Sequence, residues 1–334
     1  MRTTGGITAV AVAAAVSLVL AGCGSTSSST TTPEPSLPTA VSTSPHHDSP
    51  PPPPLSHHTR HPHSPTTSAS ASAEPGPSKV LVFLVENHSL DEMQAQMPWT
   101  AALAAHYGYA TSYHAMTHPS LPNYLAIAGG STFGVTDDAD PSSHPLAGSS
   151  VFGEALAHGD TARVYAEDMP GTCVTAPAGE YAVKHNPWAY FVDERASCDR
   201  YDVPLTALAS DARTGSLPNA GMVVANMCHI AHDCPLGTAD TWLRDHVGPV
   251  LAGPDFATGR LVVVITADED DQSGDNRVLT VVASRAMPDH QVVSTPLNHL
   301  SLSRLYAEVV GFAPLRGAAA APSLADAFHL PLGG

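Results

Sequence analysis

The fold is decided by the stretch from Lys79 to Val85, which reads KVLVFLV and is followed by Glu86 and Asn87. A second stretch of the same kind, from Arg260 to Thr266, reads RLVVVIT. Unbroken runs of β-branched and aliphatic residues are typical of strands that are covered on both faces. Both stretches are therefore predicted to be central strands of a buried sheet.

Shorter apolar runs alternate with helical patterns along the rest of the chain. Further strands are predicted at 161–166, 220–225 and 277–283, and helices at 98–107, 122–128, 150–158, 239–251 and 299–310. Such alternation is typical of an α/β fold in which helices flank a mostly parallel central sheet. We therefore predict a three-layer sandwich.

Oxygen-rich side chains follow both strong strands. Glu86 and Asn87 come after the first strand, and Asp268, Glu269, Asp270 and Asp271 come after the second. Ligands of such sheets bind beyond the carboxyl ends of the strands. Four consecutive acids repel one another, and a divalent cation bound to carboxylate and amide oxygens would remove that cost. The two clusters predict a metal site, although an acidic run can also be a solvated turn.

A loop with two prolines, THPSLPNY at 117–124, leads into the helix predicted from Pro122. Proline suits the first helical turn, which places Ser120 at or near the N-cap. The Ser120 side chain could simply cap the helix. Alternatively, its hydroxyl faces an anion site formed by helix N–H groups and a nearby metal, where it would act as a nucleophile toward phosphorus.

The chain has 334 residues, with 14 Lys and Arg against 31 Asp and Glu, so its formal charge is −17. Affinity for nucleic acid depends on a basic patch or stripe, and no block of Lys or Arg is present. Nucleic acid is therefore excluded as a partner. An anionic substrate would need a local positive centre, for which a metal ion is the candidate.

The segment before residue 79 has the pattern of an export signal and a tether. An apolar run at 7–20 follows Arg2 and is too short to cross a bilayer comfortably, as in a secretory signal peptide at 1–22. It leads to Cys23 in a pattern, LAGC, that resembles the lipobox of bacterial lipoproteins, so Cys23 is predicted to carry lipid. An ordinary secretory signal is the alternative.

Residues 23–78 are predicted to be a disordered tether. Positions 24–78 contain 13 Pro and 23 Ser or Thr with almost no large apolar residues, so they cannot build a core. Their six histidines could also bind a transition metal weakly. We expect a monomer with one folded domain at 79–334, anchored by lipid to the outer side of a bacterial membrane.

Four cysteines remain beyond Cys23, at positions 173, 198, 228 and 234. They allow three disulfide connectivities, and proximity in the sequence favours Cys173 with Cys198 and Cys228 with Cys234. A zinc site built from cysteine and histidine is the alternative.

Seven ordered motifs between 79 and 334 carry a resemblance to a known family. They are Val85-Glu-Asn-His-Ser89, Thr117-His-Pro-Ser120-x-Pro-Asn123-Tyr, Tyr165-Ala-Glu-Asp-x-Pro, Lys184-His-Asn-Pro-Trp, Asn226-x-Cys-x-x-x-His232-Asp-Cys, Thr266-x-Asp268-Glu-Asp-Asp and Asn298-His-x-Ser-x-x-Arg-Leu. Together they resemble the phosphoesterase family of bacterial acid phosphatases and phospholipases C, and most of all the secreted acid phosphatases of mycobacterial type. The family's fold is similar to that of alkaline phosphatase and the sulfatases.

The resemblance implies roles for individual residues of a catalytic domain at 79–334. It implies that one or more divalent metal ions, of unknown identity, are held by Glu86, Asn87, Asp268 and Glu269. It further implies that Ser120 is the nucleophile, that Asn123 holds phosphoryl oxygens, and that His185 or His232 protonates the leaving alkoxide. The expected substrate is a phosphorylated small molecule or a phospholipid headgroup, such as a phosphoinositide, hydrolysed as a monoester. A phospholipase C-type phosphodiesterase and a metal- or wall-binding surface lipoprotein are the alternatives.

Two positions depart from the family pattern or leave their role open. Relatives commonly read Asn-Asp-Met-His where this chain has His229-Ile-Ala-His232, so an acidic neighbour that would orient His232 is missing. His229 could be a metal ligand, a substitute base or a surface residue. Glu167 could contact a substrate group or belong to an ordinary turn at the end of a strand.

Overall fold

The computed structural model describes residues 76–332. The predicted signal peptide, Cys23 and nearly all of the predicted tether lie outside the described residues. Ten strands are present among the described residues. They are β1 Lys79–Val85, β2 Gly108–Ala110, β3 Tyr113–His114, β4 Ala162–Ala166, β5 Asp202–Pro204, β6 Ala220–Val224, β7 Leu261–Ala267, β8 Thr280–Ala283, β9 Gln291–Val293 and β10 Leu297–Asn298.

The helices alternate with these strands. The α-helices are α1 Leu90–Gln96, α2 Pro98–His106, α3 Ser120–Gly129, α4 Val151–Ala157, α5 Arg195–Tyr201, α6 Leu208–Thr214, α7 Leu236–Leu251, α8 Pro254–Ala257, α9 His299–Val310 and α10 Leu324–Ala327. Short 3-10 helices are η1 Val183–His185, η2 Pro187–Tyr190, η3 Val192–Glu194, η4 Leu205–Ala207 and η5 Arg316–Ala320. Within the described part of the chain, no helix has the length and apolar character needed to cross a membrane.

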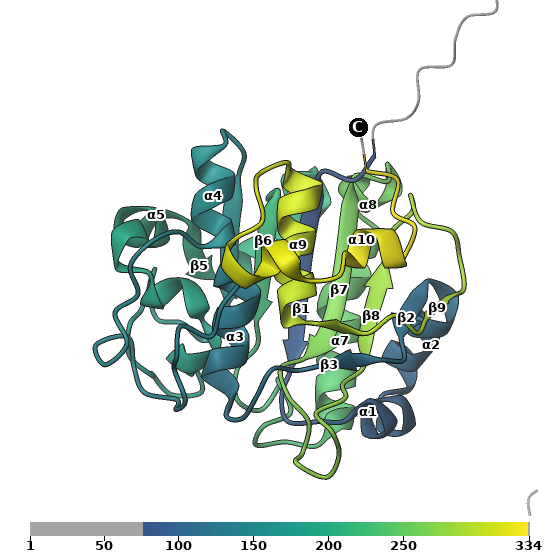
Figure 1. Cartoon of the computed structure of the whole chain (residues 1–334), viewed down its shortest axis with the longest axis horizontal. Helices are drawn as coiled ribbons and strands as arrows, with labels where there is room; N and C mark the ends of the chain where they lie inside the picture. Colours follow the sequence, from purple (N-terminus) through teal and green to yellow (C-terminus); the bar gives the residue numbers. More distant parts are fainter. Residues whose placement is uncertain (1–75, 333–334) are drawn as a thin grey trace, which may run out of the picture. The chain divides into compact units, whose positions relative to one another are not determined.

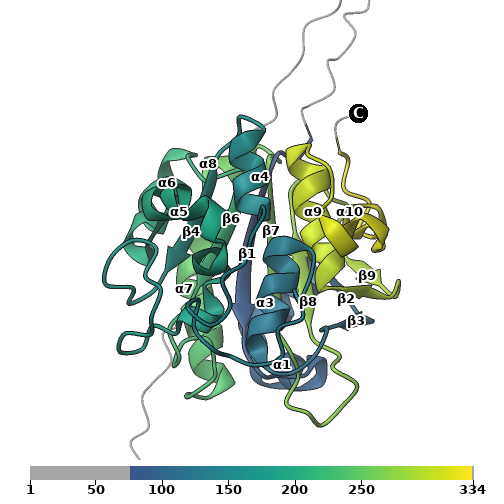
Figure 2. The same ribbon diagram turned by 60° about the vertical axis from the view of Figure 1, so that its left-hand side comes forward.

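Eight strands form one sheet in the order β5-β4-β6-β1-β7-β8-β2-β9, and β3 pairs with β10 in a small second sheet. β8 pairs antiparallel with both of its neighbours, and the other pairs of the large sheet are parallel. Helices α3, α4 and α9 cover one face, and α2, α6, α7 and α8 cover the other (Figures 1 and 2). The predicted three-layer α/β fold with a mostly parallel sheet is confirmed.

The central strands are buried because helices cover both faces of the sheet. In β1 every residue after Lys79 is buried, and in β7 all seven residues are. β1 pairs with β7 from Lys79 opposite Leu261 to Val85 opposite Ala267, so the two strands end side by side. The side chains that follow them, Glu86 and Asp268, therefore emerge at the same edge of the sheet.

Helix α3 begins at Ser120, two residues before the predicted start at Pro122. The earlier start is possible because the Asp138 carboxylate accepts a hydrogen bond from the backbone N–H of Leu121 at 2.9 Å, which satisfies an amide that the helix itself leaves unpaired. The helix ends at Gly129 and is followed by the cap residue Gly130, whose φ of 66° suits glycine and where a Cβ would collide with the Leu315 carbonyl.

The four described cysteines form the two predicted disulfides, Cys173–Cys198 and Cys228–Cys234. Cys173, Cys198 and Asp202 are also the only described group of three Cys, His, Asp or Glu side chains whose ligand atoms all lie within 4.8 Å of one another. Because the two sulfurs are bonded to each other, they offer no thiolate to a metal. The zinc alternative is therefore wrong.

Asp202→Asn is expected to raise the free energy of unfolding at pH 8 and to change it little at pH 4. Burial raises the pKa of Asp202 from 3.8 to about 8, and a hydrogen bond from the Asn186 amide at 2.8 Å and the charge of Arg195 offset only part of that rise. Between about pH 4 and pH 8 the unfolded chain loses this proton before the folded chain does, so stability falls as pH rises. Urea unfolding of both proteins at pH 4, 6 and 8 measures the difference, and a gain that is equal at all three values would contradict the argument.

Candidate active site

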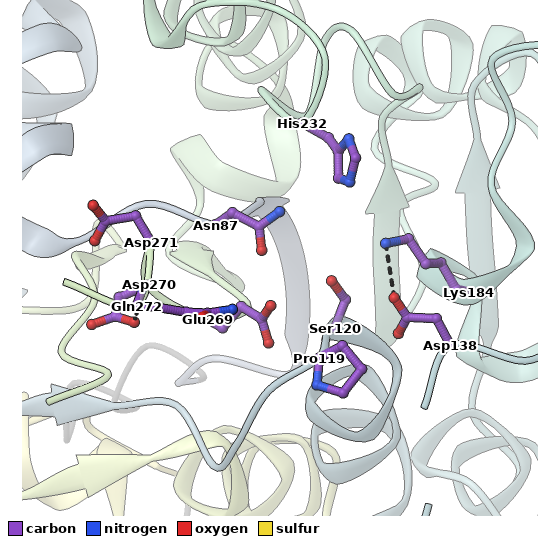
Figure 3. A pocket seen from close by; sticks show the side chains of 10 residues that line it. All are labelled: Asn87, Pro119, Ser120, Asp138, Lys184, His232, Glu269, Asp270, Asp271 and Gln272. Carbon is purple, nitrogen blue, oxygen red and sulfur yellow. Dashed lines mark hydrogen bonds and ion pairs between the residues drawn. The ribbon is translucent and has the colours of Figure 1, made fainter. Parts of the chain in front are cut away.

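Loops from neighbouring strands surround one pocket of about 400 Å³. It lies beyond the carboxyl ends of β6, β1 and β7, which are adjacent in the sheet. Its lining comprises Asn87, Pro119, Ser120, Asp138, Lys184, His232, Glu269, Asp270, Asp271 and Gln272 (Figure 3). The sequence prediction that the segments after β1 and β7 would meet the Ser120 loop agrees with this arrangement.

Glu86 is the buried centre of the site. Its Oε1 accepts hydrogen bonds from Ser120 Oγ at 2.5 Å and from His185 Nε2 at 2.7 Å. The ammonium of Lys184 lies 3.2 Å from the same oxygen. Burial opposes ionisation, but the charges of His185 and Lys184 and the bonds from His185 and Ser120 lower the pKa of Glu86 to about 2. The Ser120 hydroxyl therefore does not cap its own helix but donates a hydrogen bond to the ionised carboxylate of Glu86.

Asp268 and Glu269 bring two further carboxylates to this place. Asp268 is fully buried, and its Oδ1 accepts the backbone N–H groups of Asn87 at 3.2 Å and Glu269 at 2.8 Å. Burial and the charges of Glu86 and Glu269 raise the pKa of Asp268 well above its usual range. Burial also raises the pKa of Glu269 to about 7, even though His118 opposes the shift. Three buried carboxylates so close together repel one another when they are ionised, and a bound cation would offset that repulsion.

The unsatisfied oxygens of this cluster fit a metal ion. Glu86 Oε2 and Asp268 Oδ2 are buried and have no hydrogen-bond partner among the described residues. Buried carboxylate oxygens are normally bonded or bind a metal. Asn87, in the left-handed region at φ 56°, directs its amide into the same pocket (Figure 3). The donors are carboxylate and amide oxygens, which suit a hard divalent cation.

Asn123 lies beside the pocket but does not line it. Its Nδ2 donates to Glu269 Oε2 at 3.0 Å and to the Thr117 carbonyl at 2.8 Å, while its Oδ1 accepts the N–H groups of Met116 and Thr117. The side chain is completely buried. Every polar atom of Asn123 is therefore bonded within the protein, and these bonds hold Glu269 in place. Its predicted contact with phosphoryl oxygens stays a prediction.

The two predicted histidines occupy different positions. His185 is fully buried, stacks on the Tyr124 ring at 5.1 Å, and is not among the residues that line the pocket. His232 lines the pocket opposite Ser120 (Figure 3). Its Nδ1 lies 2.6 Å from Asp233 Oδ1, so the carboxylate that appeared to be missing is supplied by the next residue.

Lys184 and Asp138 are pocket residues that sequence reasoning missed. Lys184 Nζ lies 3.1 Å from Asp138 Oδ2 as well as 3.2 Å from Glu86 Oε1. Burial works against the ammonium, but Glu86 and Asp138 outweigh it and raise the pKa of Lys184. Lys184 is one of only two lysines in the chain and precedes His185 in the sequence, which was an available signal. Nothing local distinguishes Asp138 from its acidic neighbours.

The chain is similar to proteins that are named as phosphatases. The chain is 34% identical over 209 residues to a phosphatidylinositol-3-phosphatase of Mycobacterium tuberculosis, which covers 60% of this chain and 67% of that protein. It is 31% identical over 192 residues to a phosphate-repressible acid phosphatase of Penicillium chrysogenum, which covers 54% of this chain and 45% of the fungal protein. The match thus spans less than half of the fungal enzyme.

A solved structure of a protein in the alkaline phosphatase superfamily from Vibrio parahaemolyticus aligns with a TM-score of 0.50, over 73% of this chain and 70% of that chain. At 11% identity this likeness concerns the fold alone, and it confirms the predicted fold type. The model of the Phosphoesterase family matches residues 89–308, which is well over half of the chain. The chain therefore belongs to the Phosphoesterase family of phosphoric ester hydrolases.

Proposed function

We propose that the chain is a metal-dependent acid phosphatase that hydrolyses phosphate monoesters through a phosphoserine intermediate. The observation that carries the proposal is the position of Ser120. Its hydroxyl stands in the wall of the pocket and is bonded to the ionised Glu86, beside two further carboxylates and one ammonium group. Relatives named as phosphatases support a phosphorylated substrate.

The residues of the chain divide the reaction into two steps. In the first, the ionised Ser120 Oγ forms a bond to phosphorus, and the bond from phosphorus to the alcohol oxygen breaks. His232 gives its proton to that oxygen as it leaves. In the second step, water attacks the phosphoserine and gives a proton to the now neutral His232, the bond from phosphorus to Oγ breaks, inorganic phosphate is released, and Ser120 Oγ is again ionised. An acidic pH optimum is proposed because relatives of the chain are named as acid phosphatases.

Lys184 supplies a fixed positive charge in a pocket whose other charged groups are mostly acidic. An ammonium group has three N–H donors, and the carboxylates of Glu86 and Asp138 occupy two of those of Lys184. The third donor is available to a phosphoryl oxygen. We assign Lys184 to binding the transferred group and His185 to holding Glu86.

Glu86, Asn87, Asp268 and Glu269 would hold the divalent metal. A bound cation would polarise the phosphoryl oxygens and favour the ionised form of the Ser120 hydroxyl. Its identity among hard cations such as calcium, magnesium and manganese is an expectation from the oxygen donors.

The natural substrate is proposed to be a phosphorylated small molecule or the headgroup of a phosphoinositide. The latter follows the name of the mycobacterial relative. We also propose that lipid at Cys23 places the domain at the outer surface of a bacterial membrane, within reach of either substrate.

A phosphate-release assay on the purified protein tests the function. We expect turnover of phosphomonoesters that is faster at acidic than at alkaline pH, lost with a chelator and restored by one divalent cation. A phosphomonoester, a phosphoinositide and phosphatidylcholine are compared as substrates. Activity that a chelator leaves unchanged would remove the metal from the proposal, and faster cleavage of phosphatidylcholine would favour a phosphodiesterase.

A further inference from the structure

Glu167 follows β4 directly, and its carboxylate is bonded to the loop that carries His232. Its Oε2 accepts the backbone N–H of Asn226 at 3.1 Å, and both of its oxygens lie 3.0 Å from His229 Nδ1. Its Oε1 also accepts the indole N–H of Trp242 at 3.1 Å. One carboxylate therefore connects the end of β4, the loop and helix α7.

The loop at 226–234 is attached on its other sides as well. The Ile230 carbonyl accepts the backbone N–H of Glu86 at 2.8 Å, and Ile230 is fully buried. The Cys228–Cys234 disulfide closes the loop. By contrast, within the part of the chain that the structure describes, the His232 side chain bonds only to Asp233, which belongs to the same loop. The position of the His232 ring therefore depends on the loop backbone and on the residues that bond to the loop.

His229 does not act in the pocket that contains Ser120. It lines a different pocket of about 490 Å³ together with Glu167, Trp242 and His246. Its ring stacks on Trp242, which stacks in turn on His246. The Nδ1 of His229 and the indole N–H of Trp242 both bond to Glu167, so the polar groups between them are used internally. This arrangement fits a support for the loop better than a site for a ligand.

We propose that Glu167 and His229 are positioning residues that hold His232 at the distance from which it protonates the leaving group. The inference rests on the proposed function, because it assigns a task to residues behind the proposed general acid. Glu167 reaches the loop across the fold, from the end of β4, and bonds to His229 and to the backbone of Asn226. Glu167 and His229 thus form one unit behind the loop that carries His232.

The test is the dependence of kcat/KM on the leaving group. A good leaving group such as p-nitrophenolate needs little protonation, whereas an alkoxide such as that of glycerol needs a proton from the enzyme. We expect His232→Ala to lower kcat/KM for glycerol phosphate by about a hundredfold or more, the scale of general acid catalysis, and for p-nitrophenyl phosphate far less.

Glu167→Gln is expected to reproduce that pattern at a smaller size, with about a tenfold loss on glycerol phosphate and a loss of less than about twofold on p-nitrophenyl phosphate. The amide keeps the size of the carboxylate, but its nitrogen must face either the backbone N–H of Asn226 or the indole N–H of Trp242, so one bond becomes a clash between donors. His229→Gln is the second variant, and it removes a ring that is only half buried. We expect the same larger loss on glycerol phosphate than on p-nitrophenyl phosphate.

Combining His232→Ala with Glu167→Gln should give no further loss on glycerol phosphate than His232→Ala alone, because a misplaced acid cannot matter once the acid is absent. Asp245→Asn is the matched control. Asp245 lines the same second pocket but is exposed and pairs with its neighbour Arg244, so this variant should behave like the unmodified protein.

The outcomes separate the two proposals. If His232→Ala affects both substrates equally, His232 is not the acid and the proposed mechanism fails, and this inference with it. His232→Ala could lower kcat/KM mainly for glycerol phosphate while Glu167→Gln and His229→Gln lower kcat/KM equally for both substrates, or for neither. In that case the mechanism stands and the positioning role is overturned. Losses that simply add in the double variant would overturn it as well.

Discussion

Ser120→Ala is expected to lower kcat for phosphate monoesters by about four orders of magnitude or more, the scale on which loss of a nucleophile acts in other hydrolases. The variant should fold normally. Ser120 Oγ donates to Glu86 Oε1, and that oxygen keeps His185 and Lys184 as partners when the hydroxyl is removed. The loss therefore reports the chemistry of the hydroxyl and not a collapse of the site.

Two measurements accompany the rate. Rapid acid quenching of the unmodified protein during turnover, followed by mass spectrometry, should find a phosphoryl group on Ser120 and none on the alanine variant. Ser89→Ala is the matched control, because this serine follows β1 and the metal-site residues Glu86 and Asn87 but bonds to Glu92 in a capping box of α1. It should lose about 1 kcal/mol of stability and keep its turnover. Near-normal turnover of Ser120→Ala would show that the nucleophile is a different group.

The strands that define the fold were predictable because burial on both faces demands a continuous apolar run. β1 and β7 agree with the prediction to within one residue at each end. The short strands β2, β5 and β9 at or near the edges of the sheet were not found, since three residues carry too little pattern to stand out. The antiparallel direction of β8 also has no local signal, because direction depends on how the chain returns to the sheet.

The same distinction holds for the site. Glu86 and Asp268 were predictable as neighbours because each directly follows a strand of the core, and Ser120 because it opens a helix after a loop rich in proline. Asp138 and Glu167 were not predictable in their roles. Each acts through a partner more than 45 residues away, Lys184 for Asp138 and His229 for Glu167, and such pairings arise only from the folded arrangement.

Asp268→Asn is expected to abolish metal binding and to lower kcat by about three orders of magnitude or more, comparable to loss of other groups that act as a unit with a nucleophile. The amide can keep the hydrogen bonds that Asp268 Oδ1 accepts from Asn87 and Glu269. It places a nitrogen where the unpartnered Oδ2 stood, and it removes one of three crowded negative charges. The shape of the site is therefore kept while its affinity for a cation is lost.

Thermal unfolding with and without metal gives the second measurement. The difference in stability between the variant and the unmodified protein should depend on whether metal is present. With a chelator present, Asp268→Asn should be at least as stable as the unmodified protein, because a buried charge that repels Glu86 and Glu269 is gone. With metal at a hundred times its dissociation constant, the unmodified protein should gain about 2.7 kcal/mol and the variant nothing. Asp275→Asn, at an exposed acid further along the same loop that pairs with His114, should bind metal and turn over normally. An Asp268→Asn protein that still gains stability from metal would place the cation elsewhere, and the role of the two unpartnered oxygens would have to be sought in direct contact with the substrate.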